Sequence, residues 1–105
     1  MAEFPKNLAQ CTGFEWDTGN AEKNWDLHKV SPAETEEAFF NRPILVVPDH
    51  THSQREQRYA GLGKTNAGRK LSIIFTVRGT LVRVISARDM SRRERRFYEQ
   101  ARTAE

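Results

Sequence analysis

The clearest hydrophobic pattern in the chain is the alternation along residues 70–78. One face of this stretch is apolar, and the other face is polar apart from Ile74. The apolar positions are Leu71, Ile73, Phe75 and Val77. Alternation over this length predicts a half-buried β-strand. Gly79 and Thr80 follow as a short turn, so residues 81–88 are predicted to pair back as the second arm of a hairpin.

Three other segments are predicted to be strands. Residues 14–17 alternate apolar and polar side chains, and residues 44–47 form a short apolar run between two prolines. Residues 58–64 are also predicted to be a strand, which Gly61 and Gly63 are expected to weaken. A polar loop is expected to join the last two of these strands.

Three segments carry the signals of helices. Residues 17–29 begin with an Asp-Thr pair that can cap a helix, and their apolar side chains recur at helical spacing. The Ser-Pro-Ala-Glu sequence at residues 31–34 forms a capping box with proline at the first helical position, and Pro43 ends this second helix. A second capping box starts the last helix, which we predict over residues 91–104.

Most aromatic side chains are assigned to the core. Trp16 and Trp25 are expected to be buried, because small domains usually bury tryptophan. In the last helix, the inner face is predicted to consist of Phe97, Tyr98 and Ala101.

The predicted order of elements is β-α-α-β-β-β-β-α, which indicates an α+β fold with helices packed on a small antiparallel sheet. The chain has 105 residues, enough for one compact domain. Residues 1–13 show no periodicity and are expected to be an N-terminal tail, and residues 14–105 are expected to form the domain.

The charge is small in total and uneven along the chain. The net charge is +3, with most of the acidic residues in the first 49 positions and most of the arginines after position 54. The planar guanidinium group of arginine can pair with phosphate or carboxylate through two hydrogen bonds. This distribution predicts a polyanion or an acidic protein as the partner, with a merely solvated surface as the alternative.

Several observations bear on the compartment. No apolar run approaches the ~18 residues that a membrane-spanning helix needs. The first ten residues contain no apolar stretch typical of a secretion signal, and the single cysteine, Cys11, cannot form an internal disulfide. We therefore expect a cytoplasmic protein that does not bind membranes.

Two groups of residues form a recognisable pattern. In the first half of the chain they are Phe14-Glu15-Trp16-Asp17, Asn24, His28, Val30, Ser31 and Glu34. In the second half they are Gly68-Arg69, Leu71, Arg83, Ile85-Ser86-Ala87-Arg88, Arg92, Glu94-Arg95 and Tyr98. Together they resemble the BrnT toxin family of bacterial toxin–antitoxin systems, and the resemblance spans about residues 14–100.

The resemblance implies a RelE-like fold and a ribonuclease toxin that arrests growth. It also implies a cognate BrnA-like antitoxin with a ribbon-helix-helix domain, so that DNA is contacted only through the antitoxin. Where the family often has Lys-His-Gly, this chain has Leu27-His28-Lys29. The alternative function is therefore a non-catalytic module of the same fold that binds the antitoxin or nucleic acid.

Cleavage of RNA without a metal needs a base for the 2′-hydroxyl proton, cations for the charged phosphorane and an acid for the leaving oxygen. The catalytic candidates are His28, Glu56, Arg69, Arg83 and Arg88. No metal or other cofactor is expected, since the Asp-His-Thr-His sequence at residues 49–52 matches no zinc-binding spacing.

Each candidate also has a structural interpretation. An unperturbed imidazole titrates in the range useful for proton transfer, but His28 shares a helix face with Ala21 and Trp25, where a hydrogen-bonded structural histidine is the more common outcome. Arg83 lies on a strand face among apolar residues and requires either an acidic partner or a cleft. Glu56 is expected to form an ion pair with Arg58 rather than an acid–base pair.

A second set of basic residues is assigned to binding RNA or the antitoxin. These residues are Lys29, Arg58, Lys64, Arg78, Arg92, Arg93, Arg95 and Arg96. The last four crowd the first turns of the final helix, where cations oppose the helix dipole. Helix stability does not explain them, whereas RNA phosphates or an acidic antitoxin segment would.

Overall fold

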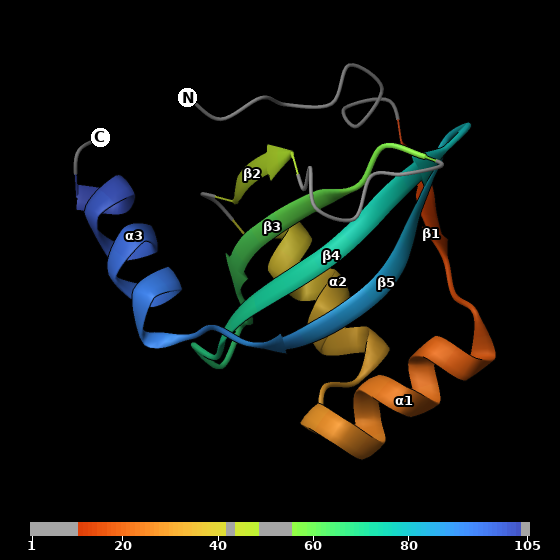
Figure 1. The fold of residues 1–105 in the computed structure, drawn as a ribbon, viewed down its shortest axis with the longest axis horizontal. Helices are drawn as coiled ribbons and strands as arrows, with labels where there is room; N and C mark the ends of the chain where they lie inside the picture. Colours follow the sequence, from red (N-terminus) through yellow and green to blue (C-terminus); the bar gives the residue numbers. More distant parts are fainter. Residues whose placement is uncertain (1–10, 42–43, 49–55, 104–105) are drawn as a thin grey trace.

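A computed structural model describes residues 11–41, 44–48 and 56–103 (Figure 1). The elements are β1 (Gly13–Glu15), α1 (Thr18–His28), α2 (Pro32–Phe40), β2 (Leu45–Pro48), β3 (Tyr59–Lys64), β4 (Lys70–Arg78), β5 (Leu81–Asp89) and α3 (Arg92–Thr103). The predicted α+β order is confirmed, and most boundaries agree to within one or two residues. Pro43 and most of the polar loop, with His50 and His52, lie outside the described residues.

The strands form one sheet in the order β1-β5-β4-β3-β2. The pairs from β2 to β5 are antiparallel, as predicted, whereas β1 pairs with β5 in parallel. The parallel pair was not predicted, because the two strands lie far apart in the sequence and no local turn joins them. It places Glu15 beside Arg83 at one end of the sheet.

The helices form layers on both faces of the sheet. Phe39 of α2 packs edge-on against Phe75 of β4, with ring centroids 4.9 Å apart. Tyr98 of α3 instead clusters with Leu62 of β3 and with Met90. We call the face under α2 the helix face, and the opposite face, one end of which α3 covers, the open face (Figure 1).

Helix α1 continues the helix layer beside β5. Its buried contact with the strand is polar: the Asn24 side chain is 5% exposed and its Oδ1 accepts a hydrogen bond of 3.3 Å from the backbone N–H of Ala87. Asp17 caps the start of α1 by accepting from the N–H of Asn20. Consequently the inward face of α1 centres on Asn24 rather than on Trp25.

One of the two glycines of β3 marks where α2 crosses the sheet. A Cβ atom at Gly63 would meet the carbonyl oxygen of Ala38 at a distance that real atoms do not reach. A Cβ atom at Gly61 would instead lie 3.3 Å from the ring of Phe75 in the neighbouring strand. Gly63 therefore allows α2 to pack closely, and β3 is a regular six-residue strand despite its two glycines.

The apolar side of the predicted alternation in β4 is confirmed, since Leu71, Ile73 and Phe75 are each 0% exposed, whereas Ser72 and Thr76 on the other side are also buried. Ile74 breaks the alternation at a bulge: Ile74 pairs with Ser86 and Phe75 pairs with Val84, so that β5 carries one extra residue at this point. The bulge increases the local twist and changes the direction of the rest of β5.

Two aromatic predictions are wrong. Trp25 is 50% exposed, with the Lys29 ammonium 5.4 Å from its ring centroid, and Phe97 is 51% exposed on α3. Trp16 is partly buried against the core, and its indole N–H donates to Glu36 over 2.8 Å. Tyr98 is buried, as predicted.

Among the described residues, no helix has the length and apolar character required to cross a membrane.

Candidate functional site

A hollow of about 460 Å³ lies where β4 begins, β5 ends and α3 begins. It is lined by Gly68, Arg69, Lys70, Asp89, Met90 and Arg95. The hairpin brings the start of β4 beside the end of β5, and the second capping box turns the chain directly into α3. Concave sites with convergent charged groups are the usual places of binding and catalysis.

Arg69 lies in the wall of the hollow and uses all five of its N–H donors within the chain. Its Nε and Nη2 donate to the two carboxylate oxygens of Asp89, at 2.7 and 3.1 Å. Nη1 donates to the carbonyl of Lys29 over 2.7 Å and to Glu34 over 3.2 Å, and Nη2 also donates to the carbonyl of His28 over 2.9 Å. Arg69 therefore ties the end of α1 and the start of α2 to the end of β5.

These bonds set the ionisation of the groups around Arg69. Hydrogen bonds from Arg69 are the main reason that the pKa of Asp89 is lowered, and the charges of Arg95 and His28 add to the effect. The hydrogen bonds that Arg69 donates to Asp89 and Glu34 raise the pKa of Arg69, although burial opposes this. In this arrangement no donor of Arg69 is left for phosphate, so its hydrogen bonds describe a structural role, and a catalytic role for Arg69 stays a prediction.

Two other cations line the hollow. Arg95 is exposed, and no carboxylate in the described parts of the chain forms an ion pair with its guanidinium. The Lys70 ammonium pairs with Glu99 of α3 over 2.6 Å, at side-chain exposures of 29% and 42%. Ion pairs this exposed contribute at most about 1 kcal/mol, so a phosphate can displace the carboxylate.

His28 lies beside the hollow, at the last position of α1. Its carbonyl is fixed by Arg69, and its side chain is close enough for its charge to influence Asp89. His28 is half-buried, so its ring is accessible from one side. Of the predicted catalytic residues, it is the one that the structure places next to the hollow with a group that can transfer protons.

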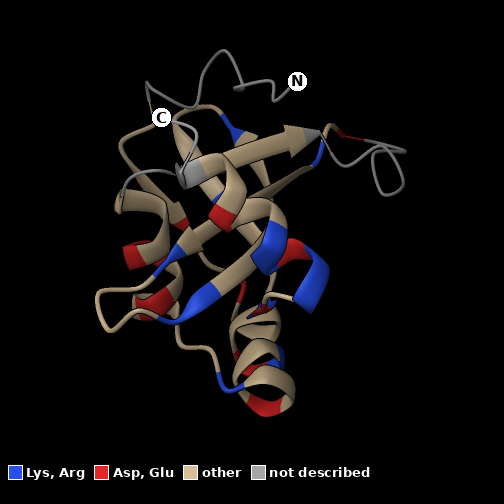
Figure 2. Ribbon diagram, turned by 90° about the vertical axis from the view of Figure 1, so that its left-hand side faces the viewer, with Lys and Arg blue, Asp and Glu red and all other residues tan. Residues whose placement is uncertain are grey.

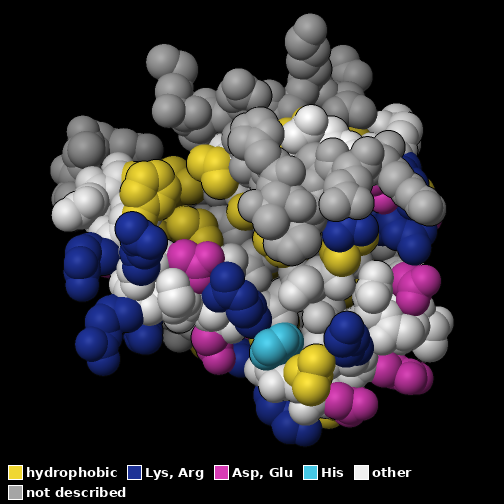
Figure 3. All heavy atoms as spheres, viewed as in Figure 1, with side chains coloured by type: hydrophobic (Ala, Val, Ile, Leu, Met, Phe, Trp, Pro, Cys, Tyr) yellow, Lys and Arg dark blue, Asp and Glu magenta, His cyan; other side chains and the backbone are white. Residues whose placement is uncertain are grey.

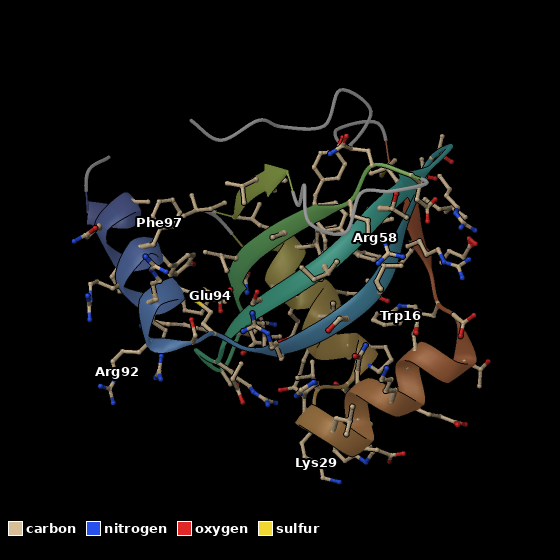
Figure 4. All side chains as sticks on the ribbon, in the orientation of Figure 1. Trp16, Lys29, Arg58, Arg92, Glu94 and Phe97 are labelled. Carbon is tan, nitrogen blue, oxygen red and sulfur yellow. The ribbon has the colours of Figure 1, made fainter. Side chains whose placement is uncertain are left out.

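Arg88 and Glu94 form a second ion pair, on the open face next to the hollow. Arg88 donates through Nη1 and Nη2 to the two oxygens of Glu94, at 2.7 and 3.0 Å. Ser72 and the N–H of Ser91 also donate to this carboxylate. Burial opposes ionisation of Glu94, but these hydrogen bonds outweigh it and lower its pKa to about 2. The pair fixes the first turn of α3 against β4 and β5 (Figure 4).

The remaining catalytic candidates lie at the other end of the sheet. Arg83 pairs with Glu15 at 3.4 Å and with Asp17 at 3.5 Å, and Glu56 pairs with Arg78 at 3.3 Å, where a pair with Arg58 was predicted. We call these residues the hairpin-end cluster. Arg78 and Lys70 are the two ends of β4, roughly 25 Å apart at the usual rise per strand residue. The predicted catalytic residues therefore do not converge on one spot.

The predicted binding residues are spread over several surfaces. Lys29 has a left-handed backbone with φ of 54° and points away from the body of the protein (Figure 4). Arg58 lies over the open face, and Lys64 ends β3. The four arginines in the first turns of α3 are exposed, and Figure 2 shows basic and acidic residues interleaved at this end of the molecule. They are Arg92, Arg93, Arg95 and Arg96.

A family model described as "Ribonuclease toxin, BrnT, of type II toxin-antitoxin system" matches residues 16–94. The chain belongs to the BrnT family. It is a ribonuclease toxin of a type II toxin–antitoxin system, which has RNA as its substrate and an antitoxin as its partner. No curated protein matches the chain.

The fold of this BrnT-family chain is similar to a solved structure of the family. The crystal structure of the ribonuclease toxin BrnT of Brucella abortus matches with a TM-score of 0.59 and 23% identity, over 76% of this chain and 97% of that one. The family match includes every residue that lines the hollow except Arg95, which lies one position beyond it.

Sequence reasoning missed several residues of the hollow. Lys70, Asp89 and Met90 were read only as the ends of strands or left unassigned. Gly68, with φ of 92°, turns the chain into β4. A signal was present, because Asp89 and Met90 stand between a predicted strand and a capped helix, where loops of a rigid scaffold often carry function.

Proposed function

We propose that this toxin cleaves RNA at the hollow, without a metal ion, with His28 as the proton-transfer group. The observation that carries the proposal is the placement of Arg95 and Lys70 in one concave site, with His28 beside it. The carboxylate of Asp89 in the same wall is neutralised by Arg69, so the cations there can attract an RNA phosphate.

The chemistry follows from these groups. His28 takes the proton of a ribose 2′-hydroxyl, and the 2′-oxygen attacks the adjacent phosphorus. Arg95 and Lys70 stabilise the negative charge that develops on the phosphorane oxygens. The 5′-oxygen of the next nucleotide leaves and takes a proton from water in the open hollow. The products are a 2′,3′-cyclic phosphate and a 5′-hydroxyl end.

Two ion pairs act as positioning groups in this proposal. Arg69 holds the end of α1, and with it His28, against the end of β5. The pair of Arg88 and Glu94 holds the start of α3, from which Arg95 projects. Neither pair needs to contact the substrate for the site to keep its shape.

The hairpin-end cluster is proposed to bind RNA away from the scissile bond. The ion pairs of Arg83 are long, at 3.4 and 3.5 Å, and partly exposed. Such pairs exchange partners readily. The phosphates of an RNA chain that crosses the open face can therefore replace the carboxylates. Arg58 lies on the same face.

Replacing Lys70 or Arg95 with alanine tests the proposed site. Each variant is expected to lower kcat/KM for cleavage of a short single-stranded RNA by about 10- to 100-fold, because each removes a cation that stabilises the transition state. Lys23→Ala removes one exposed cation from α1 and is the matched control. If the two variants cleave as fast as the control, the hollow is not the site.

We further propose that the antitoxin is a BrnA-like protein with a ribbon-helix-helix domain, and that the pair acts in the cytoplasm, where its RNA substrate is. The resemblance of the sequence to the BrnT family supports both points. A short reading frame next to the toxin gene is expected to encode the antitoxin. Co-expression of its product should restore the growth of cells that produce the toxin.

A further inference from the structure

The outward side of α3 combines strong positive charge with an exposed aromatic ring. Arg92, Arg93, Arg96 and Phe97 are all exposed, and we call them the α3 surface. Arginines in the first turns of a helix oppose its dipole, so they do not stabilise α3. A binding partner with negative charge would account for their position.

The α3 surface continues into an apolar region. Phe97 is 51% exposed, and hydrophobic side chains gather beside α3 on the side toward β2 (Figure 3). Leu45 of β2 is partly buried there, against the cluster of Leu62, Met90 and Tyr98. Apolar area next to concentrated charge is typical of protein-binding surfaces, whose centre is apolar and whose rim is polar.

Strand β2 is the outermost strand of the sheet on this side. Its inner edge pairs with β3, so its outer edge is the side on which another chain can align. The charge of α3, the apolar region and the sheet edge thus lie next to one another at one end of the molecule (Figures 1 and 3).

We propose that the α3 surface is the docking site of the antitoxin, and that it takes an acidic segment carrying at least one large apolar side chain. The apolar side chain covers Phe97, and the carboxylates pair with Arg92, Arg93 and Arg96. The aliphatic Leu45 favours a protein over RNA here, because RNA binding to aromatic and basic groups relies on stacking and phosphate contacts. The inference rests on the proposed partner.

Docking at this surface also accounts for neutralisation of the toxin. Arg95 lines the hollow and lies on α3 three residues after Arg92, so it is a neighbour of the Arg92 side of the α3 surface. A segment bound along α3 therefore lies at the rim of the hollow and excludes RNA from it. The negative charge of the segment would add repulsion of the RNA phosphates.

The test measures the affinity of the purified toxin for the purified product of the adjacent gene. Phe97→Ala and the charge reversal Arg93→Glu are each expected to raise the Kd at least tenfold. Both side chains are exposed, so the fold should be retained, which circular dichroism checks. Lys23→Glu reverses one exposed charge on α1 and is the matched control.

An unchanged Kd in both variants would overturn the docking proposal. A rise in the KM for RNA that exceeds the rise in the Kd for the antitoxin would overturn it too, because the α3 surface would then be a binding site for RNA. The Lys70→Ala variant separates the two proposals: it should lose cleavage and keep its affinity for the antitoxin. If Lys70→Ala cleaves normally, the proposed cleavage site fails, whereas the Kd measurements still decide the docking site.

Discussion

Replacing His28 with alanine is expected to lower kcat for RNA cleavage by about 10²- to 10⁴-fold, the usual effect of removing a general base. The ring lies beside the hollow, and none of the residues that line the hollow carries an imidazole, which can both accept and donate a proton. Lys70 and Arg95 carry charge there, and the pKa of Asp89 is lowered mainly by hydrogen bonds from Arg69. The measurement is single-turnover cleavage of a labelled oligonucleotide with enzyme in excess.

The matched control is Leu27→Ala, which changes the adjacent and exposed side chain of the same helix turn. It should cleave within about twofold of the parent, as expected for a surface substitution away from the chemistry. The Kd for a 2′-O-methyl oligonucleotide, which cannot be cleaved, should change little in His28→Ala because the cations remain. A His28→Ala variant that cleaves at the rate of Leu27→Ala would remove histidine from the mechanism.

Replacing Arg69 with alanine is expected to lower the free energy of unfolding by about 2–4 kcal/mol, a large part of the stability of a domain this size. The substitution leaves Asp89 and Glu34 without their cation and leaves the carbonyls of His28 and Lys29 without their donor. Since the side chain of Arg69 is 27% exposed, water reaches part of the site and the loss stays below that of a fully buried pair. Urea denaturation measures the change.

Two further variants define the origin of this loss. Arg69→Lys keeps the charge but supplies fewer donors in a different geometry, so it should recover less than half of the lost stability. Arg92→Ala removes an exposed arginine from α3 and should change stability by less than about 0.5 kcal/mol. If Arg69→Lys is as stable as the parent, charge alone explains the role of Arg69 and the hydrogen-bond account is wrong.

Local signals were enough to predict the elements of this fold. The alternation of β4, the turn at Gly79 and the capping box of Ser31 and Glu34 each depend on residues close in sequence, and each is confirmed. The parallel pairing of β1 with β5 depends on contacts between distant segments. Trp25 and Phe97 were misplaced because helical spacing identifies a stripe of the helix but not how much of it the sheet covers.

The site was predicted less well than the fold. Composition identified the arginines but could not assign their partners, and Arg69, Arg78, Arg83 and Arg88 each proved to face a carboxylate. Three of those four carboxylates lie at least 20 residues away along the chain, and only the tertiary fold brings them near. Lys70 and Asp89 were not predicted as site residues for the same reason, because only the hairpin and α3 together make them neighbours.

Chemical-shift mapping of the labelled toxin with a 2′-O-methyl RNA oligonucleotide tests most directly whether the hollow is the RNA cleavage site. The backbone amides of residues 68–70 and 89–95 are expected to shift most and to saturate together with the side chain of His28. Smaller shifts are expected at Arg58 and Arg83. If the largest shifts instead cluster around Arg78 and Arg83, and residues 89–95 do not respond, RNA binds at the hairpin end and the proposed site is wrong.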